Sequence, residues 1–309
     1  MSALTSHKSI DEASLLNVHL RRIWWALDSP SFLSIPETAG YFHNEEHRQA
    51  IWQSLLDLDQ NEAEVNSYFD SLGHMPMGRY FEQLLFFILQ RDEGYDILAF
   101  NEQIVESKIT LGELDLVLYN HNTKQKEHWE LALKYYLQVA NSGAHDNFLG
   151  PSKRDYLGRK MTKLFDRQMP LSQHPQIKQQ YGPLQSKLFL KGQLFYPTSK
   201  AIVAPLQANP QMPAYEYIDL KRLSQLERSE AKHFKILKKP DWIGVNLLRS
   251  SESLLDYSEL EDSLILEIQR IDRPQLLALF KEVDQGYLEY KRLFVCPDAW
   301  PLSQTTSNL

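Results

Sequence analysis

Two neighbouring segments of alternating apolar and polar residues constrain the fold of this chain more than any other feature of its sequence. Residues 112–119 and 128–138 both alternate with the period of two that is typical of β-strands. Five of the residues between them, His121-Asn-Thr-Lys-Gln125, are typical of a turn. The sequence therefore predicts an antiparallel hairpin.

The same alternation places charged side chains on one face of the hairpin. Glu113 and Asp115 share a face of the first strand, and Glu130, Lys134 and Gln138 share a face of the second. Magnesium in proteins prefers one or two carboxylates together with waters and a substrate phosphate. A nearby lysine can stabilise charge that develops on that phosphate. These residues predict metal-assisted hydrolysis of a phosphodiester, with Gln138 as a candidate for orienting water or substrate.

The segments around the hairpin extend it into a mixed α/β core over residues 73–200. Residues 79–90 form an apolar helical pattern that contains one unexpected acid, Glu82. Further strand patterns cover residues 97–106 and 187–196, and a helix is predicted over residues 151–169. The predicted order is helix, three strands, helix and strand.

Helical spacing dominates residues 1–72, which predicts an N-terminal helical region. Residues 201–309 are expected to form a C-terminal α/β extension whose final stretch, after Pro301, is loose. The expected strands are residues 215–220, 242–248 and 293–296, and the expected helices are residues 264–271 and 274–283.

These residues resemble the PD-(D/E)xK nuclease superfamily over residues 73–200. Gly112-Glu-Leu-Asp115, followed by a hairpin and a strand with Glu130 and Lys134, carries the superfamily resemblance. Gly78-Arg-Tyr-Phe-Glu82, Glu130-Leu-Ala-Leu-Lys134 and Gly150-Pro-Ser-Lys-Arg-Asp155 carry the resemblance to the narrower family named next. Most of the chain also resembles an uncharacterised bacterial domain-of-unknown-function family within that superfamily. The resemblance implies a restriction-endonuclease-like αβββαβ core. It also implies Asp115 as a metal ligand, Lys134 as the catalytic lysine and Glu82 as an acid from the first core helix.

The sequence departs from the superfamily pattern at one position. The second acid usually lies two residues before the lysine, where this chain has Ala132. Glu130 lies two residues further upstream on the same face, a shift of roughly 6–7 Å along a strand. Metal-ligand distances are near 2 Å, so we expect a bulge, another register, or Glu82 or Glu113 to compensate if the site is active.

A basic segment in an otherwise acidic chain favours a nucleic-acid partner. Residues 151–200 hold ten Lys or Arg and two Asp or Glu, a formal charge of +8; since the chain carries −7, the remainder carries −15. At helical spacing the cations form a stripe that fits phosphate contacts, although a solvated helix face explains it equally well. The candidate nucleic-acid-binding residues are Lys153, Arg154, Lys160, Lys163 and Arg167.

Other features exclude or disfavour several classes of protein. No apolar run approaches the length of a membrane span, and no signal peptide is evident, so we expect a cytoplasmic protein without a membrane partner. The single cysteine, Cys296, excludes an intramolecular disulfide and is expected to be a small buried hydrophobe. The segment His43-Asn-Glu-Glu46-His47 matches an inverted zinc-peptidase motif, but a surface helix start is the stronger interpretation.

The leading hypothesis is a Mg²⁺-dependent DNA nuclease, with Mn²⁺ as the alternative metal. Asp115, Glu130 and Glu82 are its candidate metal ligands, and Lys134 completes the catalytic set. Two alternatives remain open, namely a nuclease fold that binds nucleic acid without cleaving it and an interaction scaffold for a protein partner. The sequence leaves open the substrate structure, the sequence specificity and the oligomeric state.

Overall fold

Helices form the N-terminal part of the molecule. The computed structural model describes residues 12–227 and 232–301. After a short 3₁₀ turn at Glu12–Ser14, the helices are α1 (Val18–Asp28), α2 (Glu45–Gln60), α3 (Glu62–Ser71) and α4 (Met77–Leu89). The Asn17 side chain caps α1 by accepting hydrogen bonds from the N–H groups of His19 and Leu20. The helical region predicted from residue 1 is thus confirmed from residue 12 onward, and residues 1–11 lie outside the described part.

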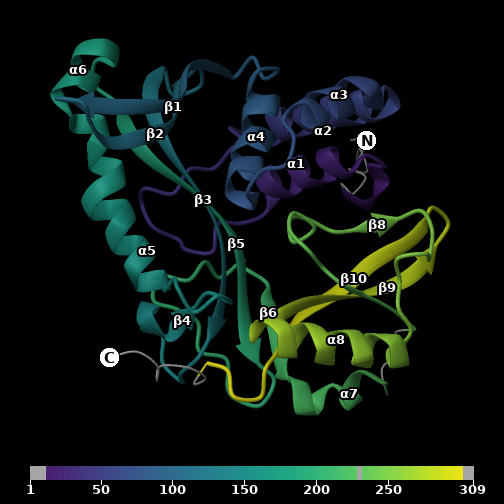
Figure 1. The fold of residues 1–309 in the computed structure, drawn as a ribbon. Coiled ribbons are helices and arrows are strands. Elements are labelled where there is room, and N and C mark those ends of the chain that lie inside the picture. Colours follow the sequence, from purple (N-terminus) through teal and green to yellow (C-terminus); the bar gives the residue numbers. More distant parts are fainter. Residues whose placement is uncertain (1–11, 228–231, 302–309) are drawn as a thin grey trace, which may run out of the picture.

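One mixed sheet of ten strands runs through the rest of the described residues (Figure 1). Its order is β1-β2-β3-β5-β6-β10-β9-β7, with β4 paired to β3 and β8 paired to β10. The pairs β3–β5, β5–β6 and β6–β10 are parallel, and the others are antiparallel. The strands are β1 (Tyr95–Glu106), β2 (Ile109–Asn120), β3 (Gln125–Gln138), β4 (Phe148–Leu149), β5 (Gln185–Pro197), β6 (Ala214–Asp219), β7 (His233–Ile236), β8 (Leu247–Leu248), β9 (Gln275–Val283) and β10 (Gly286–Cys296).

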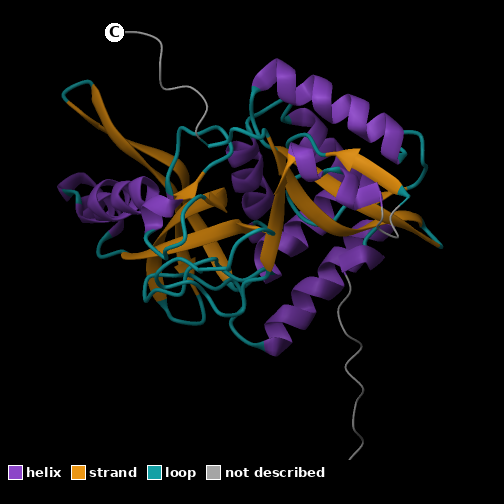
Figure 2. Ribbon diagram, turned by 90° about the horizontal axis from the view of Figure 1, so that it is seen from below, coloured by secondary structure: helices purple, strands orange, loops and turns teal. Residues whose placement is uncertain are grey.

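The remaining helices lie between these strands in sequence. They are α5 (Leu157–Lys163), α6 (Pro175–Tyr181), α7 (Ser224–Glu227) and α8 (Tyr257–Ile271). Figure 2 shows helices on both sides of the strand layer. The expectation of a mixed α/β protein is therefore confirmed. Within the described residues, no helix combines the length and the apolar character that a membrane span requires.

The centre of the sheet separates two apolar clusters. Trp129 and Leu131 of β3 pack with α1–α4, whereas Ala132 and Tyr136 pack with α5 and the turns that follow it. Figure 1 shows α1–α4 on one side of β3 and β5 and α5 on the other. This separation confirms the predicted faces of β3 and assigns Glu130 to the α5 side.

Most predicted strands are confirmed, but three other predictions needed correction. The helix expected over residues 151–169 begins only at Leu157, and after Lys163 it widens into a π-helical turn, Leu164–Gln168. In the strand expected over residues 242–248, only Leu247–Leu248 is extended. The helix expected over residues 274–283 is strand β9.

The error at β9 has a packing cause. The segment is rich in residues that favour helices, yet it lies between β10 and β7 in the sheet. Leu276, Ala278 and Phe280 join one apolar cluster, while Leu277 and Leu279 join another. Burial of both faces removes the polar alternation by which a strand is usually recognised.

The C-terminal residues extend the same sheet. Strands β6, β7, β9 and β10 continue the order that begins at β1, and helix α8 confirms the helix expected over residues 264–271. Cys296 ends β10 and is fully buried, as expected from its sequence context. The stretch after Pro301, expected to be loose, lies outside the described residues.

Candidate functional site

Asp115 and Glu130 face each other across β2 and β3. The paired register runs from Asn120 opposite Gln125 to Leu116 opposite Trp129, so the next step places Asp115 opposite Glu130. At this point Asp115 Oδ2 accepts a hydrogen bond of 2.8 Å from the backbone N–H of Leu131. The Asp115 carboxylate thus accepts the hydrogen bond that a backbone carbonyl would accept in a regular sheet, at the point where the regular pairing of the strands ends.

Burial and mutual repulsion make this carboxylate pair electrostatically costly. Asp115 is 9% exposed and Glu130 is 1% exposed. Burial, followed by the negative charge of Asp115, raises the pKa of Glu130 to about 8. Burial also raises the pKa of Asp115, although the hydrogen bond from Leu131 opposes the change. Glu130 Oε2 is buried without a hydrogen-bond partner. The pair is therefore suited to hold a proton or a cation.

Gln168 and Lys160 reach the same pair from the α5 side. The Gln168 side-chain amide donates a hydrogen bond to Glu130 Oε1. The Lys160 ammonium lies 4.0 Å from that oxygen and donates a hydrogen bond of 3.3 Å to Gln168 Oε1. Gln168 is the last residue of the π-helical turn, a feature found often at functional sites. Sequence reasoning missed Gln168 because helical spacing does not reveal a widened turn.

Lys134 lies elsewhere. It is four residues along β3 from Glu130, about 13 Å in an extended strand. Its ammonium is 2.7 Å from Asp155 Oδ2, and the Tyr136 hydroxyl donates to the same oxygen at 3.2 Å. Glu130, which lies two residues before the usual position of the second acid, is directly opposite Asp115 in the strand register. Lys160 is the lysine that approaches the pair, and Ala132 occupies the position between Glu130 and Lys134 on this face.

Glu82 of α4 lies near the pair but is held by an arginine. Arg79 donates hydrogen bonds to Glu82 Oε2 at 2.8 Å and to Glu113 Oε1 at 2.9 Å. Burial raises the pKa of Glu82, with a further contribution from the negative charge of Asp115. Arg79 thus bridges the two additional acids that were expected to compensate for Ala132.

The predicted basic stripe divides between the interior and the surface. Lys160 points inward and its side chain is only 12% exposed, while Arg154, Lys163 and Arg167 are exposed. Lys153 precedes α5 and lies 3.6 Å from Asp272. The surface part therefore retains three of the five predicted nucleic-acid-binding side chains. Gln138 binds the Ala140 carbonyl at 3.1 Å and the Val203 N–H at 3.4 Å, eight residues along β3 from Glu130.

Asp115 and Glu130 are the residues that could hold a hard divalent cation, through two protein ligands. In residues 12–227 and 232–301, no cluster of three or more His, Cys, Asp or Glu side chains is arranged to hold a metal ion. Mg²⁺ commonly takes only one or two carboxylates and keeps several waters. The buried Glu130 Oε2 atom, which has no hydrogen-bond donor, is the observation that favours a cation at Asp115 and Glu130.

The histidine motif has a structural explanation in the described residues. His47 Nε2 lies 3.0 Å from Asp92 Oδ2, and the Tyr41 hydroxyl donates to that oxygen at 2.6 Å. The His43 ring stacks on His47 with a centroid distance of 4.4 Å, and Glu46 is exposed. This cluster anchors the start of α2 against the turn between α4 and β1.

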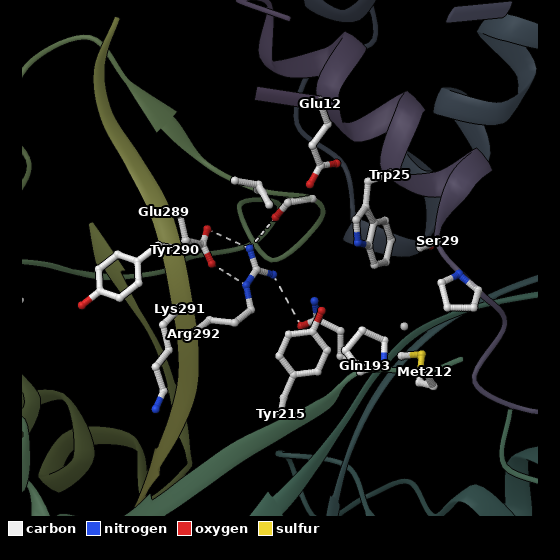
Figure 3. Close-up of a pocket in the computed structure, with 15 residues that line it drawn as sticks. Glu12, Trp25, Ser29, Gln193, Met212, Tyr215, Glu289, Tyr290, Lys291 and Arg292 are labelled. Carbon is white, nitrogen blue, oxygen red and sulfur yellow. Dashed lines mark hydrogen bonds and ion pairs between the residues drawn. The ribbon is translucent and has the colours of Figure 1, made fainter. Parts of the chain in front are cut away.

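A separate pocket of about 260 Å³ lies beside α1, β5 and β10 (Figure 3). The buried Arg292 guanidinium on its wall donates to Glu289 Oε2 at 2.8 Å, to the Trp242 carbonyl at 2.6 Å and to the Gly244 carbonyl. The positive charge of Arg292 is paired with Glu289, and its bonds to the two carbonyls join β10 to the 242–244 loop. We assign this pocket a structural role.

The family of the chain follows from comparison with known proteins. The family model described as "Domain of unknown function (DUF1853)" matches residues 21–296, which include β2, β3, α5 and the carboxylate pair. No curated protein and no solved structure matches the chain. The chain therefore belongs to the DUF1853 family.

Proposed function

We propose that this protein is a Mg²⁺-dependent phosphodiesterase that cleaves DNA. The observation that carries the proposal is the buried, directly opposed pair of Asp115 and Glu130, approached by the Lys160 ammonium. Two like charges at such a position are unfavourable unless a proton or a cation lies between them. The pair lies on paired strands beside a basic surface, a position that is consistent with hydrolysis of a phosphate backbone.

The element order supports a restriction-endonuclease-like core. Helix α4, strands β1, β2 and β3, helix α5 and strand β5 follow the αβββαβ order of the PD-(D/E)xK superfamily. In this proposal Glu130 is the second acid. Ala132 then occupies the position two residues later, where the superfamily usually has its lysine. The proposal accordingly transfers the role of that lysine from Lys134 to Lys160.

The chain's own residues have distinct parts in the proposed reaction. Bound Mg²⁺, or Mn²⁺ in its place, would neutralise charge on the scissile phosphate and activate a water molecule. Asp115 and Glu130 would hold the ion, with the backbone N–H of Leu131 fixing Asp115 and the Gln168 amide fixing Glu130. Lys160 would supply positive charge as the phosphate oxygens become more negative. The exposed Arg154, Lys163 and Arg167 would contact flanking phosphates.

A nuclease assay with matched metals tests the proposal. Wild-type protein is expected to cut DNA with Mg²⁺ or Mn²⁺ and to be inactive in EDTA, and Asp115→Asn is expected to abolish cutting. Mg²⁺ should raise the melting temperature of the wild type and leave that of Asp115→Asn unchanged. Failure of Mg²⁺ to bind or to support cutting by the wild type contradicts the proposal.

One observation favours a second candidate, a protein that binds DNA without cleaving it. The Glu130 carboxylate is almost entirely buried, and Arg79 already engages Glu82 and Glu113. A shared proton between Asp115 and Glu130 would then be sufficient to stabilise the fold. Salt-dependent DNA binding without cutting, unchanged in Asp115→Asn, would support this candidate. Absence of DNA binding would leave the scaffold hypothesis.

A further inference from the structure

A second pocket, with a volume of about 430 Å³, lies where the C-terminal part of the sheet meets the turn before α5. Three separate segments line it: the turn at Pro151 and Ser152, the loop between Leu237 and Trp242, and the junction of α8 with β9. Trp242 forms an apolar part of its wall, and its ring packs against Tyr135 at 5.2 Å and Phe294 at 5.3 Å. The pocket therefore has a wall anchored in the core of the protein.

The side chains that line this pocket are predominantly cationic. Lys238, Lys239, Arg270 and Arg273 line it, and Glu267 is the one carboxylate among its lining residues. The Glu267 carboxylate is 2.7 Å from the Arg270 guanidinium. Among the side chains that line the pocket, positive charges therefore outnumber negative charges by three.

Lys239 is the pocket cation that lies over the Trp242 ring. Its ammonium lies 4.7 Å from the centre of the Trp242 ring. Burial lowers the pKa of Lys239, and the positive charges of Lys134 and then Arg273 lower it further. An anion bound at this point would offset the repulsion among Lys134, Lys239 and Arg273.

The cations also connect the pocket to the carboxylate pair. Lys134 affects the pKa of Lys239 on one side and, on the other, contributes to the lowered pKa of Lys160. Lys134, Lys160 and Lys239 come from β3, α5 and the loop after β7. The electrostatic influence of Lys134, whose ammonium is paired with Asp155, thus reaches both the pocket and the surroundings of Glu130.

We propose that the pocket around Lys239 and Arg273 binds a phosphate group. Ammonium and guanidinium groups supply the charge-assisted hydrogen bonds that phosphate oxygens accept, and the Ser152 hydroxyl offers a further donor. The identification of the phosphate as one belonging to the DNA strand at Asp115 and Glu130 rests on the proposed function. A free phosphate or a phosphomonoester would present the same chemistry.

Binding measurements on the full chain test the pocket independently of cleavage. The probes are inorganic phosphate, a single-stranded oligonucleotide with a terminal phosphate, and the same oligonucleotide without it, all in EDTA. The test variant is Lys239→Gln/Arg273→Gln. The matched control is Lys108→Gln/Lys124→Gln, which removes the same charge at two exposed hairpin turns.

We expect the test variant to bind phosphate-bearing probes at least about tenfold more weakly, which corresponds to about 1.4 kcal/mol. The control variant should bind like the wild type. For DNA, the steepness of the salt dependence should fall by about one to two counterions in the test variant alone. Lys239→Arg/Arg273→Lys should restore binding, which separates loss of charge from damage to the fold.

The probes distinguish the sources of the phosphate. A defect with both oligonucleotides assigns the pocket to an internal phosphate, and a defect only with the phosphorylated one assigns it to a strand end. A defect with inorganic phosphate alone assigns it to a small phosphate compound. Wild-type affinity of the test variant for all three probes overturns the proposal. All three probes are measured in EDTA, so a failure of the nuclease proposal leaves this result unaffected.

Discussion

The Lys134 ammonium lies 2.7 Å from the Asp155 carboxylate, in the position of a structural ion pair beside the candidate site. The lysine nearest to the Asp115–Glu130 pair is Lys160 of α5, which lies 4.0 Å from Glu130 Oε1. Lys134 lies in the second strand of the hairpin and Lys160 follows the hairpin in sequence, yet only Lys160 reaches the carboxylates. This difference separates their expected roles.

Substitution of the two lysines should therefore have unequal effects on catalysis. Lys160→Gln removes the positive charge beside Glu130 and should lower the single-turnover cleavage rate by about a hundredfold or more at saturating DNA. Lys134→Gln, the matched control, should change that rate little, although it should weaken DNA binding. An equal loss of rate in both variants would contradict the assignment of the catalytic role to Lys160 rather than to Lys134.

Glu130→Gln should stabilise the protein in the absence of metal. Because the pKa of Glu130 is raised to about 8, folding at neutral pH requires this carboxyl to take up a proton, and glutamine does not. The glutamine amide can also donate to Asp115 while its oxygen still accepts from Gln168. We expect the free energy of unfolding to rise by about 1 kcal/mol at neutral pH in EDTA, as measured by urea unfolding. The stabilisation by Mg²⁺ should be lost in the same variant. A lower free energy of unfolding would show that the two carboxylates do not repel each other in the folded state.

Lys191 should make stability depend on pH. Its buried ammonium donates to the carbonyls of Leu27 and Ser29 at the end of α1, and burial lowers its pKa from 10.5 to about 7. Between these values the unfolded chain binds more protons than the folded one, so the free energy of unfolding contributed by Lys191 rises with pH. Below about pH 7 the contribution is constant.

Comparison of Lys191→Met with the wild type isolates this effect. The wild type should gain stability relative to the variant by at most about 1.4 kcal/mol for each pH unit between pH 7 and 10. Urea unfolding at several pH values measures the difference, and Lys221→Met at an exposed position serves as the control. A pH-independent difference between Lys191→Met and the wild type would show that Lys191 does not change its protonation on unfolding in this window.

Gly192 should tolerate no side chain. It lies opposite Lys134 in the β3–β5 ladder with φ of +149°, and an added Cβ would be 1.7 Å from the Lys134 carbonyl oxygen. Gly192→Ala should destabilise the protein by about 2–4 kcal/mol or prevent folding. Gly78→Ala is the matched control, because nothing lies within 4 Å of its added Cβ and alanine favours helix α4. Similar urea midpoints for the two variants would contradict the clash.

The sequence by itself determined the hairpin and the faces of its strands. Alternation fixes which side chains share a face, whereas the register that brings Asp115 opposite Glu130 became evident only in the structure. The mixed α/β class and the N-terminal helices follow from the same local periodicities. Each of these properties depends on backbone geometry over a few neighbouring residues, which is why spacing alone predicts them.

Only the tertiary structure decided which other groups reach the carboxylates. Lys160 and Gln168 arrive through the packing of α5 on the sheet and through a widened turn that helical spacing does not encode. The same limit produced the error at β9, where burial between two strands outweighs helix propensity. The choice between Lys134 and Lys160 depends on distances between segments far apart in the chain, and these are set by how whole elements pack.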